Sequence, residues 1–546
     1  MLQGLNKMKM KYLFWAVFIV LLILPVISLL HPGLPWTDDG QDHVVRIANF
    51  YINLTQGNII PRWGPNLNWG YGHPVLEFLY PLPSYIASFF HFVGFSFVDS
   101  TKIVFGLGMV FSFILMYLWL SQFSSKYASL FGAFLYTYAP YRFIDLYVRG
   151  DIGENLAFAF MPLALFFIYK LYKKADYKYL AGGSLSLAFL ILAHNAIALI
   201  YVPFILFYSI YMVYLSKERK QLIINLLLLI IGGFTVSAFF WVPGLLEGKY
   251  TLRNIVTKNI YIGRFATLSG LIYGPWDYDQ FTLQLGIFQW LALIFSPYLI
   301  WKSIKLKNKN WLLVLSLIIY TLGAIFIMLQ VSNFLWAKMM ILQNFQFPWR
   351  FLAITVFSTA VLGAFLMDEF PKKYIFYLSL IFILIVVFVS RDYFAPKGYL
   401  IKPESFYTGI YNGTTDTGES SPVWSVRFME HRPKNHLQVL DGKATVKEVK
   451  RLAVEHVYEV TVTKNTYFAE NTLYFPGWTI TANGVPVNIQ FQNMQYRGIM
   501  TFHLSPGNYI VQAKYGETRL RFISDIISAV SLIFLLGFAA FRFVKR

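Results

Sequence analysis

Long runs of apolar residues, separated by short polar segments, make up most of the chain. Twelve of these runs approach the roughly 20 residues that a helix needs to cross the hydrocarbon core of a bilayer. The pattern therefore predicts a polytopic α-helical membrane protein with about twelve spans. The predicted spans lie near residues 12–30, 101–121, 126–140, 155–171, 179–193, 196–215, 222–241, 283–300, 311–330, 350–367, 374–390 and 523–541.

The pattern changes between residues 391 and 520, where apolar and polar residues alternate. Val460 and Val462 alternate with polar neighbours, and the Asn483-Gly484 pair separates two further alternating runs. Such alternation indicates half-buried strands, and Asn-Gly between two such runs is typical of a tight hairpin. This part of the chain is therefore predicted to be an antiparallel β-domain of the sandwich type.

The two patterns divide the chain into three parts. Residues 1–390 form a multi-span membrane domain with a large first outer loop at 31–100. Residues 391–520 form the β-domain, and residues 521–546 supply a final transmembrane anchor and tail. Within the β-domain, the stretch 408–422 is rich in Thr, Gly and Ser and is predicted to be a mobile loop.

Composition supports a membrane protein and narrows its chemistry. Of the 546 residues, 57% are hydrophobic and 13% are charged, whereas about 25% are charged in a typical soluble domain. The net charge of +19 is no sign of a nucleic-acid partner, because the Lys and Arg residues lie in short clusters between apolar runs. The chain contains no cysteine, which excludes disulfides and thiolate chemistry.

These basic clusters predict the orientation of the chain. With twelve spans, every cluster falls on one side of the membrane, which the positive-inside rule assigns to the cytoplasm. Both termini are then cytoplasmic, and the β-domain lies outside the plasma (cytoplasmic) membrane. The basic start and long first apolar run favour an uncleaved signal anchor. The clusters include Lys7, Lys9 and Lys11; Lys170, Lys173, Lys174 and Lys178; Lys217, Arg219 and Lys220; Lys302, Lys305, Lys307 and Lys309; and Arg542, Lys545 and Arg546.

An acidic loop directly follows the first predicted span. Asp38, Asp39, Asp42 and His43 lie within six residues of one another, at the expected outer edge of the bilayer. Carboxylates there can act as a general base, hold sugar hydroxyls or bind a divalent metal such as Mg²⁺ or Mn²⁺, for which Asp39 and Asp42 are the candidates. The alternative is a solvated turn in which an Asp caps a helix.

Other outer segments bring arginines, acids and aromatic residues to the same side. Arginine forks suit phosphate, and Trp faces suit a sugar ring or the membrane interface. Arg149 and Arg350 are the expected phosphate contacts. The structural alternatives are an ion pair for Arg149, lipid headgroup contact for Arg350 and a backbone contact for His194. The candidate substrate-binding residues are Asp42, His43, Arg46, Arg62, Trp63, Arg142, Asp145, Arg149, Glu154, His194, Trp349 and Arg350. A further outer loop carries Lys249, Arg253, Lys258, Arg264 and Trp276.

Several of these residues belong to recognisable motifs. The motifs are Asp39-Gly40 with Asp42-His43 and Arg46, Pro61-Arg62-Trp63, Asn68-Trp69-Gly70-Tyr71-Gly72, Tyr80-Pro81-Leu82-Pro83, Tyr138-Ala139-Pro140-Tyr141-Arg142, and Asp145 to Gly150 with Glu154. They resemble the prokaryotic membrane family labelled 6-pyruvoyl-tetrahydropterin synthase-related. The overall layout resembles the GT-C glycosyltransferase superfamily, and residues 474–478 with the following hairpin are similar to the outer domain of YfhO-like membrane proteins.

The resemblance implies an enzyme that uses a polyprenyl-phosphate-linked sugar. It maps the catalytic acid of GT-C enzymes onto the Asp38-Asp39 pair without distinguishing the two. The expected function is an inverting glycosyltransferase that serves a glycan, lipid or protein acceptor outside the membrane. Two alternatives are a transporter or flippase for lipid-linked or polyanionic substrates, and a non-catalytic cell-envelope assembly protein. The scarcity of charged residues within the spans disfavours transport.

Overall fold

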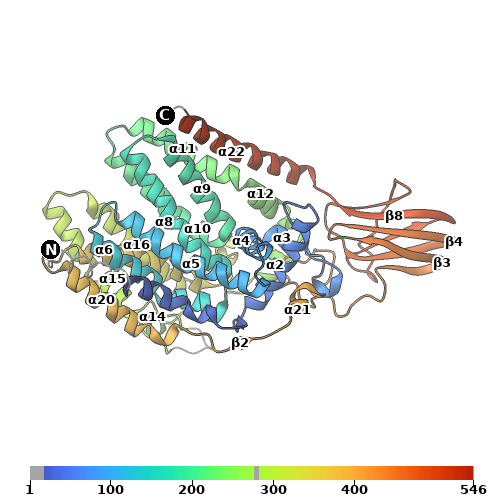
Figure 1. Cartoon of the computed structure of the whole chain (residues 1–546), viewed down its shortest axis with the longest axis horizontal. Helices are drawn as coiled ribbons and strands as arrows, with labels where there is room; N and C mark the ends of the chain where they lie inside the picture. The colour runs from blue at the N-terminus through green and yellow to red at the C-terminus, as the bar shows by residue number, and fades with distance from the viewer. Residues whose placement is uncertain (1–16, 276–281, 545–546) are drawn as a thin grey trace, which may run out of the picture.

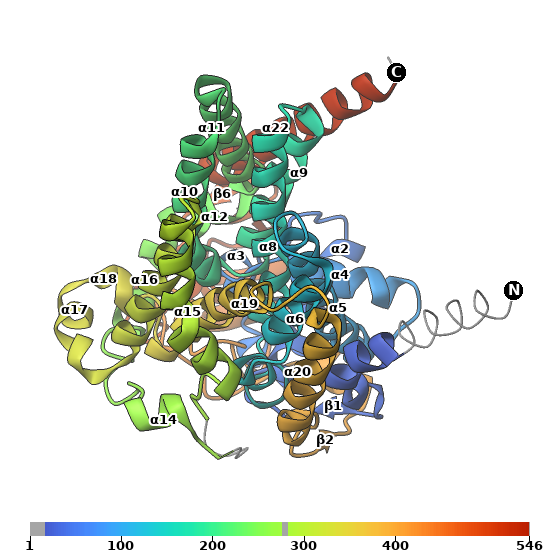
Figure 2. The ribbon, with the colours of Figure 1, turned by 90° about the vertical axis from the view of Figure 1, so that its left-hand side faces the viewer.

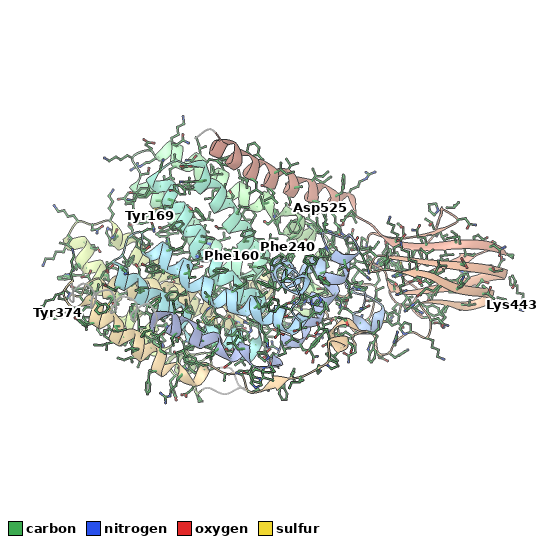
Figure 3. The ribbon with its side chains drawn as sticks, in the orientation of Figure 1. Phe160, Tyr169, Phe240, Tyr374, Lys443 and Asp525 are labelled. Atoms are coloured by element: carbon green, nitrogen blue, oxygen red, sulfur yellow. The ribbon has the colours of Figure 1, made fainter. Side chains whose placement is uncertain are left out.

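The computed structural model describes residues 17–275 and 282–544, with side chains up to Gly537. A helical body occupies one end of the molecule and a β-domain the other (Figure 1). Lys443 lies at the far tip of the β-domain, and Tyr374 lies at the opposite end of the helical body (Figure 3). The basic residues at the start of the chain and Trp276 lie outside the described residues.

The helical body contains the predicted spans. Within the described residues, eight helices are long and apolar enough to cross a membrane. The three shorter apolar helices are Val17–Leu30, α9 (Tyr177–Ala193) and α20 (Ile375–Val389), and α6 (Lys126–Thr137) occupies the remaining predicted span. A multi-span helical protein is confirmed, while its orientation stays a prediction. The eight are α5 (Phe97–Leu120), α8 (Ile152–Lys173), α10 (Asn195–Leu215), α11 (Arg219–Val236), α15 (Ile287–Lys305), α16 (Asn310–Met328), α19 with the turn before it (Pro348–Met367) and α22 from Arg519 to Gly537.

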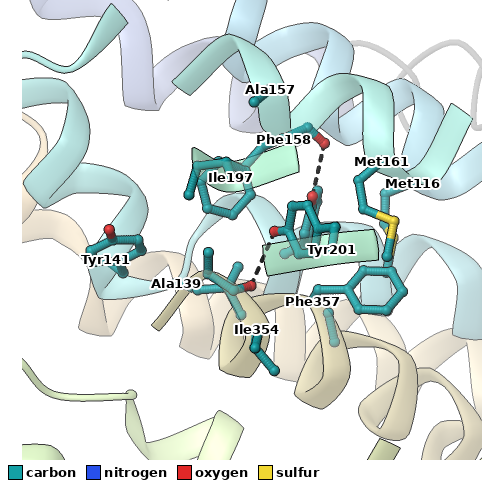
Figure 4. Close-up of a cluster of buried hydrophobic side chains, with 14 of the residues drawn as sticks. Met116, Ala139, Tyr141, Ala157, Phe158, Met161, Ile197, Tyr201, Ile354 and Phe357 are labelled. Atoms are coloured by element: carbon teal, nitrogen blue, oxygen red, sulfur yellow. Dashed lines mark hydrogen bonds between the residues drawn. The ribbon is translucent and has the colours of Figure 1, made fainter. Parts of the chain in front are cut away.

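The centre of the body is packed with aromatic rings whose hydroxyls bond to backbone carbonyls. Figure 4 shows Tyr201 of α10 among apolar side chains of α8 and α19 (Leu352–Met367). The Tyr201 hydroxyl donates to the carbonyl of Ala353 at 3.1 Å, and the Tyr136 hydroxyl donates to that of Phe158 at 2.8 Å. A buried polar group without a partner would cost free energy, so these bonds allow the rings to fill the core.

The β-domain is antiparallel, as predicted. Its strands are β3 (Leu437–Arg451), β4 (Glu455–Leu473), β5 (Trp478–Ala482), β6 (Val485–Val487), β7 (Ile499–Leu504) and β8 (Gly507–Tyr515). They form one hydrogen-bonded sheet in the order β3-β4-β8-β5-β6, with β7 paired to β4. The first half of β4 pairs with β8 and its second half with β7. Asn483 and Gly484 both have positive φ, at 51° and 79°, and form the predicted turn between β5 and β6.

The first outer loop fastens the β-domain to the helical body. The Trp63 ring packs against Trp478 and Tyr515, with ring centroids 5.4 and 5.3 Å away. A two-residue strand, β1 (Leu34–Pro35), pairs with β2 (Tyr399–Leu400). The start of the predicted β-domain therefore contacts the helical body, and the strands of the large sheet begin only at Leu437.

Candidate functional site

A cavity of about 690 Å³ lies where several segments that connect the helices of the body meet. Its walls come from the start of α2 (Gly40–Thr55), the turn before α8, the start of α10, two segments at 251–265 and 344–350, and the stretch 415–420. Its size is typical of sites that bind small molecules or cofactors. Of the residues singled out in the sequence, those that line it are Asp38, Asp39, His43, Arg46, Arg149, His194, Trp349 and Arg350.

The acidic loop is held in place by backbone hydrogen bonds to the turn before α8. The amide of Asp38 donates to the carbonyl of Val148 at 2.9 Å, and that of Asp39 donates to the carbonyl of Arg149 at 2.7 Å. Gly150 has a φ of 71°, and a Cβ there would lie 2.2 Å from Oγ1 of Thr37, so the close approach requires glycine.

Asp39 occupies the N-cap position of α2, but its side chain makes no capping hydrogen bond. The Thr37 hydroxyl instead accepts the amide of Gly40 at 3.1 Å. Asp39 therefore does not perform the capping role that is the structural alternative for this loop, and its carboxylate remains exposed to the cavity.

The protein around Asp39 favours the protonated form. The Asp39 side chain opens into the cavity, but the surrounding protein walls shield it from bulk water. This desolvation, followed by the nearby carboxylates of Asp151 and Asp42, raises the pKa of Asp39 to about 6 against the opposing effect of Arg149. Burial also raises the pKa of Asp38, with Arg149 again opposing. A carboxylate with a pKa near 6 is poised to accept a proton at neutral pH.

Arg149 is the centre of a buried ion cluster. Its guanidinium contacts Asp145 at 2.5 Å, Asp151 at 2.8 Å and Glu154 at 2.9 Å. The structural ion pair considered for Arg149 is therefore present, and three carboxylates occupy its fork. Asp145 and Glu154 are fully buried beneath the cavity and do not line it.

Three ligand-type side chains converge beside this cluster. One oxygen of Asp151, one of Glu154 and a ring nitrogen of His194 lie within 4.8 Å of one another. The His194 Nδ1 accepts the amide of Ile197 at 3.2 Å, which caps α10. In neutral His194 the proton then sits on Nε2, which lies 3.6 Å from Asp151. Asp151 and Glu154 also share Arg149, whose single positive charge does not neutralise the three carboxylates around it. A metal ion at this group would have to displace the Nε2 proton of His194 and the Arg149 contacts.

The two metal candidates named from the sequence, Asp39 and Asp42, lie in different surroundings, and a metal at either one stays a prediction. Asp42 accepts a hydrogen bond from the Tyr411 hydroxyl at 2.8 Å and does not line the cavity, whereas Asp39 does. Among residues 17–275 and 282–544, the convergent group of metal-ligand type is the one built on Asp151, Glu154 and His194.

His43 is held in one tautomer. The Nη1 of Arg46 lies 2.9 Å from Nδ1 of His43, and a guanidinium can only donate, so Nδ1 accepts and the ring proton is on Nε2. Burial, and then Arg46, lowers the pKa of His43 to about 3, which keeps the ring neutral. The Nε2 atom is buried without a hydrogen-bond partner. His43 is thus a neutral donor at the cavity wall. Arg46 is itself bonded to the carbonyl and hydroxyl of Thr415.

Two stacked rings with arginines at both ends form another wall. The Arg149 guanidinium lies 4.6 Å from the Trp349 ring, which stacks on Phe347 at 4.8 Å. Arg264 and Arg350 both lie against the Phe347 ring, at 4.7 and 5.3 Å. The Trp349 ring therefore packs against side chains of the protein itself. Arg350 has longer contacts to carboxylates than Arg149, at 3.9 Å to Asp151 and 3.7 Å to Glu154. Its Nη1 donates to the carbonyl of Phe345 at 3.0 Å, and its buried Nε makes no hydrogen bond.

Three predicted site residues lie away from the cavity. Arg62 contacts Glu517 at 3.1 Å and Asp525 of α22 at 2.5 Å, and Trp63 belongs to the core shared with the β-domain. Arg142 is fully buried among the helices, where it donates to Ser112 Oγ at 3.1 Å and lies over the Phe158 ring. All three side chains are buried against carboxylates or rings, and none of them lines the cavity.

The cavity also contains residues that the sequence reading did not select. Arg253 and Arg264 were noted only as part of a basic loop. The predicted mobile stretch 408–422 instead contributes Thr415, Asp416, Thr417, Glu419 and Ser420 to one wall. The Asp416 carboxylate accepts the amides of Gly418 and Ser420, which shapes this wall. The small polar residues of this stretch can be recognised in the sequence. Their position beside α2 cannot, because it depends on the tertiary structure.

Comparisons with known proteins give distant similarities. No family model matches the chain. An uncharacterised protein of Lactococcus lactis subsp. cremoris (strain MG1363) is 24% identical over 349 residues, which cover 61% of this chain and 56% of that protein. The chain thus spans about half the length of this relative.

Two solved structures are also similar to the chain. One is the Archaeoglobus fulgidus oligosaccharyltransferase in complex with Zn and sulfate, with a TM-score of 0.43 and 15% identity, covering 76% of this chain and 59% of that one. The other is ArnT from Cupriavidus metallidurans bound to undecaprenyl phosphate, with a TM-score of 0.42 and 12% identity, covering 69% of this chain and 63% of that one. Function is therefore inferred from the cavity itself.

Proposed function

We propose that the protein is a GT-C-type membrane glycosyltransferase. It transfers a sugar from a polyprenyl-phosphate-linked donor to a glycan, lipid or protein acceptor outside the plasma membrane. The observation that carries the proposal is one cavity that combines the Asp39 carboxylate, whose pKa is about 6, with Arg264 and Arg350, which lie against the Phe347 ring and not in a close carboxylate pair. Such a cavity supplies both a base for an acceptor hydroxyl and cations for a phosphate.

Asp39 is the base in this proposal. It takes the proton of the acceptor hydroxyl while the hydroxyl oxygen attacks C1 of the donor sugar. The bond between C1 and the phosphate oxygen breaks, and the polyprenyl phosphate leaves with the bonding electrons. A single displacement of this kind inverts the configuration at C1. Asp38, one residue further out on the same loop, orients the acceptor.

Arg350 and Arg264 hold the departing phosphate in this proposal. Both lie against the Phe347 ring at the cavity wall, and neither guanidinium is enclosed by three carboxylates as that of Arg149 is. Arg149 instead keeps Asp151 and Glu154 fixed beneath the site. His43 donates its Nε2 proton to a substrate oxygen, and the outer β-domain positions the acceptor. A divalent metal is not required for any of these steps.

The test is transfer by the purified protein in lipid nanodiscs. A radiolabelled polyprenyl-phosphate sugar should yield free polyprenyl phosphate and a labelled product with wild-type protein, and very little with Asp39→Asn. Asp392→Asn is the matched control, because Asp392 is 68% exposed and remote from the cavity lining. Movement of an intact donor between liposome leaflets without cleavage would refute the proposal in favour of a flippase.

A further inference from the structure

Two segments beside the cavity fold together into a small unit of short helices, here called the collar (residues 253–273 and 329–345). The collar contains α13 (Arg253–Val256), α14 (Leu268–Ile272), α17 (Asn333–Lys338) and α18 (Met340–Gln343). Ala266 and Leu329 form a parallel β-bridge, which ties the two segments together. The amide of Ala266 also donates to the carbonyl of Met328, the last residue of α16, at 2.9 Å.

A single tryptophan forms the inside of the collar. Trp336 is fully buried, stacks on Tyr261 with ring centroids 5.3 Å apart, and contacts Phe265 and Phe351 edge-on. Its Nε1 donates to the carbonyl of Ile327 at 3.1 Å. The collar is therefore a packed unit with its own core.

The outside of the collar is apolar as well. Large apolar side chains from both segments are more than half exposed, namely Ile255, Ile262, Leu268, Val331, Phe334 and Met340. A contiguous apolar surface that is exposed in this way usually marks contact with a protein, a ligand or a membrane. Exposed Lys258 and Lys338 lie within the same segments, and long basic side chains of this kind reach headgroups from the membrane interface.

The position of the collar indicates what covers this surface. Residues 329–345 connect α16, which ends at Met328, to the span that begins at Pro348. A short connection between two spans lies at the bilayer boundary. Figure 2 views the body from the end opposite the β-domain, and α17 and α18 lie at its outer edge beside α15 and α16. The exposed apolar surface continues onto α16, because Phe334 of α17 lies against Phe326 of α16 with ring centroids 6.5 Å apart. Further along α16, Ile319 is 61% exposed.

The collar is also part of the cavity. Arg253, Gly263, Arg264, Phe265 and Asn344 line the cavity from the collar side. The same unit that exposes apolar side chains at the bilayer boundary therefore presents a cation, Arg264, to the cavity interior.

We propose that the collar is embedded in the outer leaflet of the membrane and forms a lateral entrance through which the chain of a lipid phosphate reaches the cavity. The embedding of the collar in the membrane does not depend on the proposed function. The use of the entrance by a substrate does rest on the proposed function. The occupant of the outer apolar surface is bilayer lipid. The ligand class of the entrance is an anionic lipid whose phosphate meets Arg264 while its chain stays between the collar and the spans.

Embedding can be measured without any substrate. Because the chain has no native cysteine, single cysteines can carry a fluorescent probe at Met340, at Ile319 as the lipid-facing control and at Val485 of β6 as the water-facing control. In nanodiscs with spin-labelled lipids, quenching at Met340 should resemble that at Ile319, and iodide should quench only Val485 strongly. A Met340 probe that behaves like Val485 would overturn the proposal. Protection of Met340 from both quenchers would also overturn it, since a protein would then cover the surface.

Entry of the lipid chain through the collar can be tested with donors of different chain length. The double variant Phe334→Glu with Met340→Glu should raise the KM for a long-chain polyprenyl-phosphate donor several-fold and leave the KM for a water-soluble short-chain donor unchanged. An equal effect on both donors would overturn the entrance. If wild-type protein transferred from neither donor, the proposed function would fail, and the quenching result would still decide whether the collar is embedded.

Discussion

Replacement of Asp39 by Asn is the most direct test of the chemistry. Asn is nearly isosteric with Asp, and the Asp39 side chain makes no capping hydrogen bond, so the start of α2 should stay in place. The backbone bond from residue 39 to the carbonyl of Arg149 is unaffected by the change. A neutral amide, however, cannot accept the proton of an acceptor hydroxyl.

The size of the effect follows from the role and from the pKa. Removal of a general base costs about 10²–10⁴-fold in rate. A carboxylate with a pKa of about 6 is roughly nine-tenths ionised at pH 7 and roughly one-tenth ionised at pH 5. Because the ionised form is active, wild-type kcat/KM should fall as pH falls through about 6. The residual activity of Asp39→Asn should lack this acidic limb.

The assay is labelled-sugar transfer in nanodiscs between pH 4.5 and 8, with thermal unfolding as the check on folding. Asp38→Asn is the matched control on the same loop, and we expect a loss of at most about tenfold, in keeping with an orienting role rather than a base role. Equal losses in the two variants, or an unchanged acidic limb in Asp39→Asn, would contradict the assignment of the base to Asp39.

Three further predictions concern the surroundings of Asp39 and the orientation of the chain. His43→Gln, whose amide N–H can replace Nε2–H, should retain much more transfer than His43→Leu; equal loss in both would remove the donor role. Arg149→Met should lower the free energy of unfolding by about 3–5 kcal/mol, because it leaves buried carboxylates uncompensated. Arg264→Met should change thermal unfolding little, and similar unfolding of the two variants would contradict this prediction. A cysteine at Val485 should react with a membrane-impermeant reagent in intact cells and one at Lys307 should not; the reverse pattern would invert the topology.

The fold was largely predictable because its signals are local. A run of apolar residues predicts a span whatever its neighbours are, and the alternation around Val460 indicates a strand in the same way. The limits of this reasoning are visible at α6, which has only 12 helical residues where the apolar run predicted a longer span. Its helix ends before Tyr138, where the chain turns into the Pro140 segment and the buried ion cluster.

The site was predictable only in part because its chemistry depends on partners that are distant in sequence. The acidic loop and Arg350 were recognisable from residue type and position at a span end. Residue type could not separate Arg350, which lines the cavity, from Arg62, whose partners Glu517 and Asp525 lie more than 450 residues away along the chain. An arginine in an outer loop binds a ligand or closes an ion pair, and tertiary contacts decide which.

Trp63 lies away from the cavity but contacts the far end of α2, the helix that begins beside Asp39. Asp39 lies at the start of α2, a 16-residue helix of roughly 24 Å. Near its other end, the side-chain Nδ2 of Asn53 donates to the carbonyl of Trp63 at 2.9 Å, and Trp63 packs on the β-domain. Since a helix transmits displacement of one end to the other, the β-domain and the acidic loop are mechanically connected. The loop that carries Trp63 thus joins the β-domain to the helix whose other end carries Asp39.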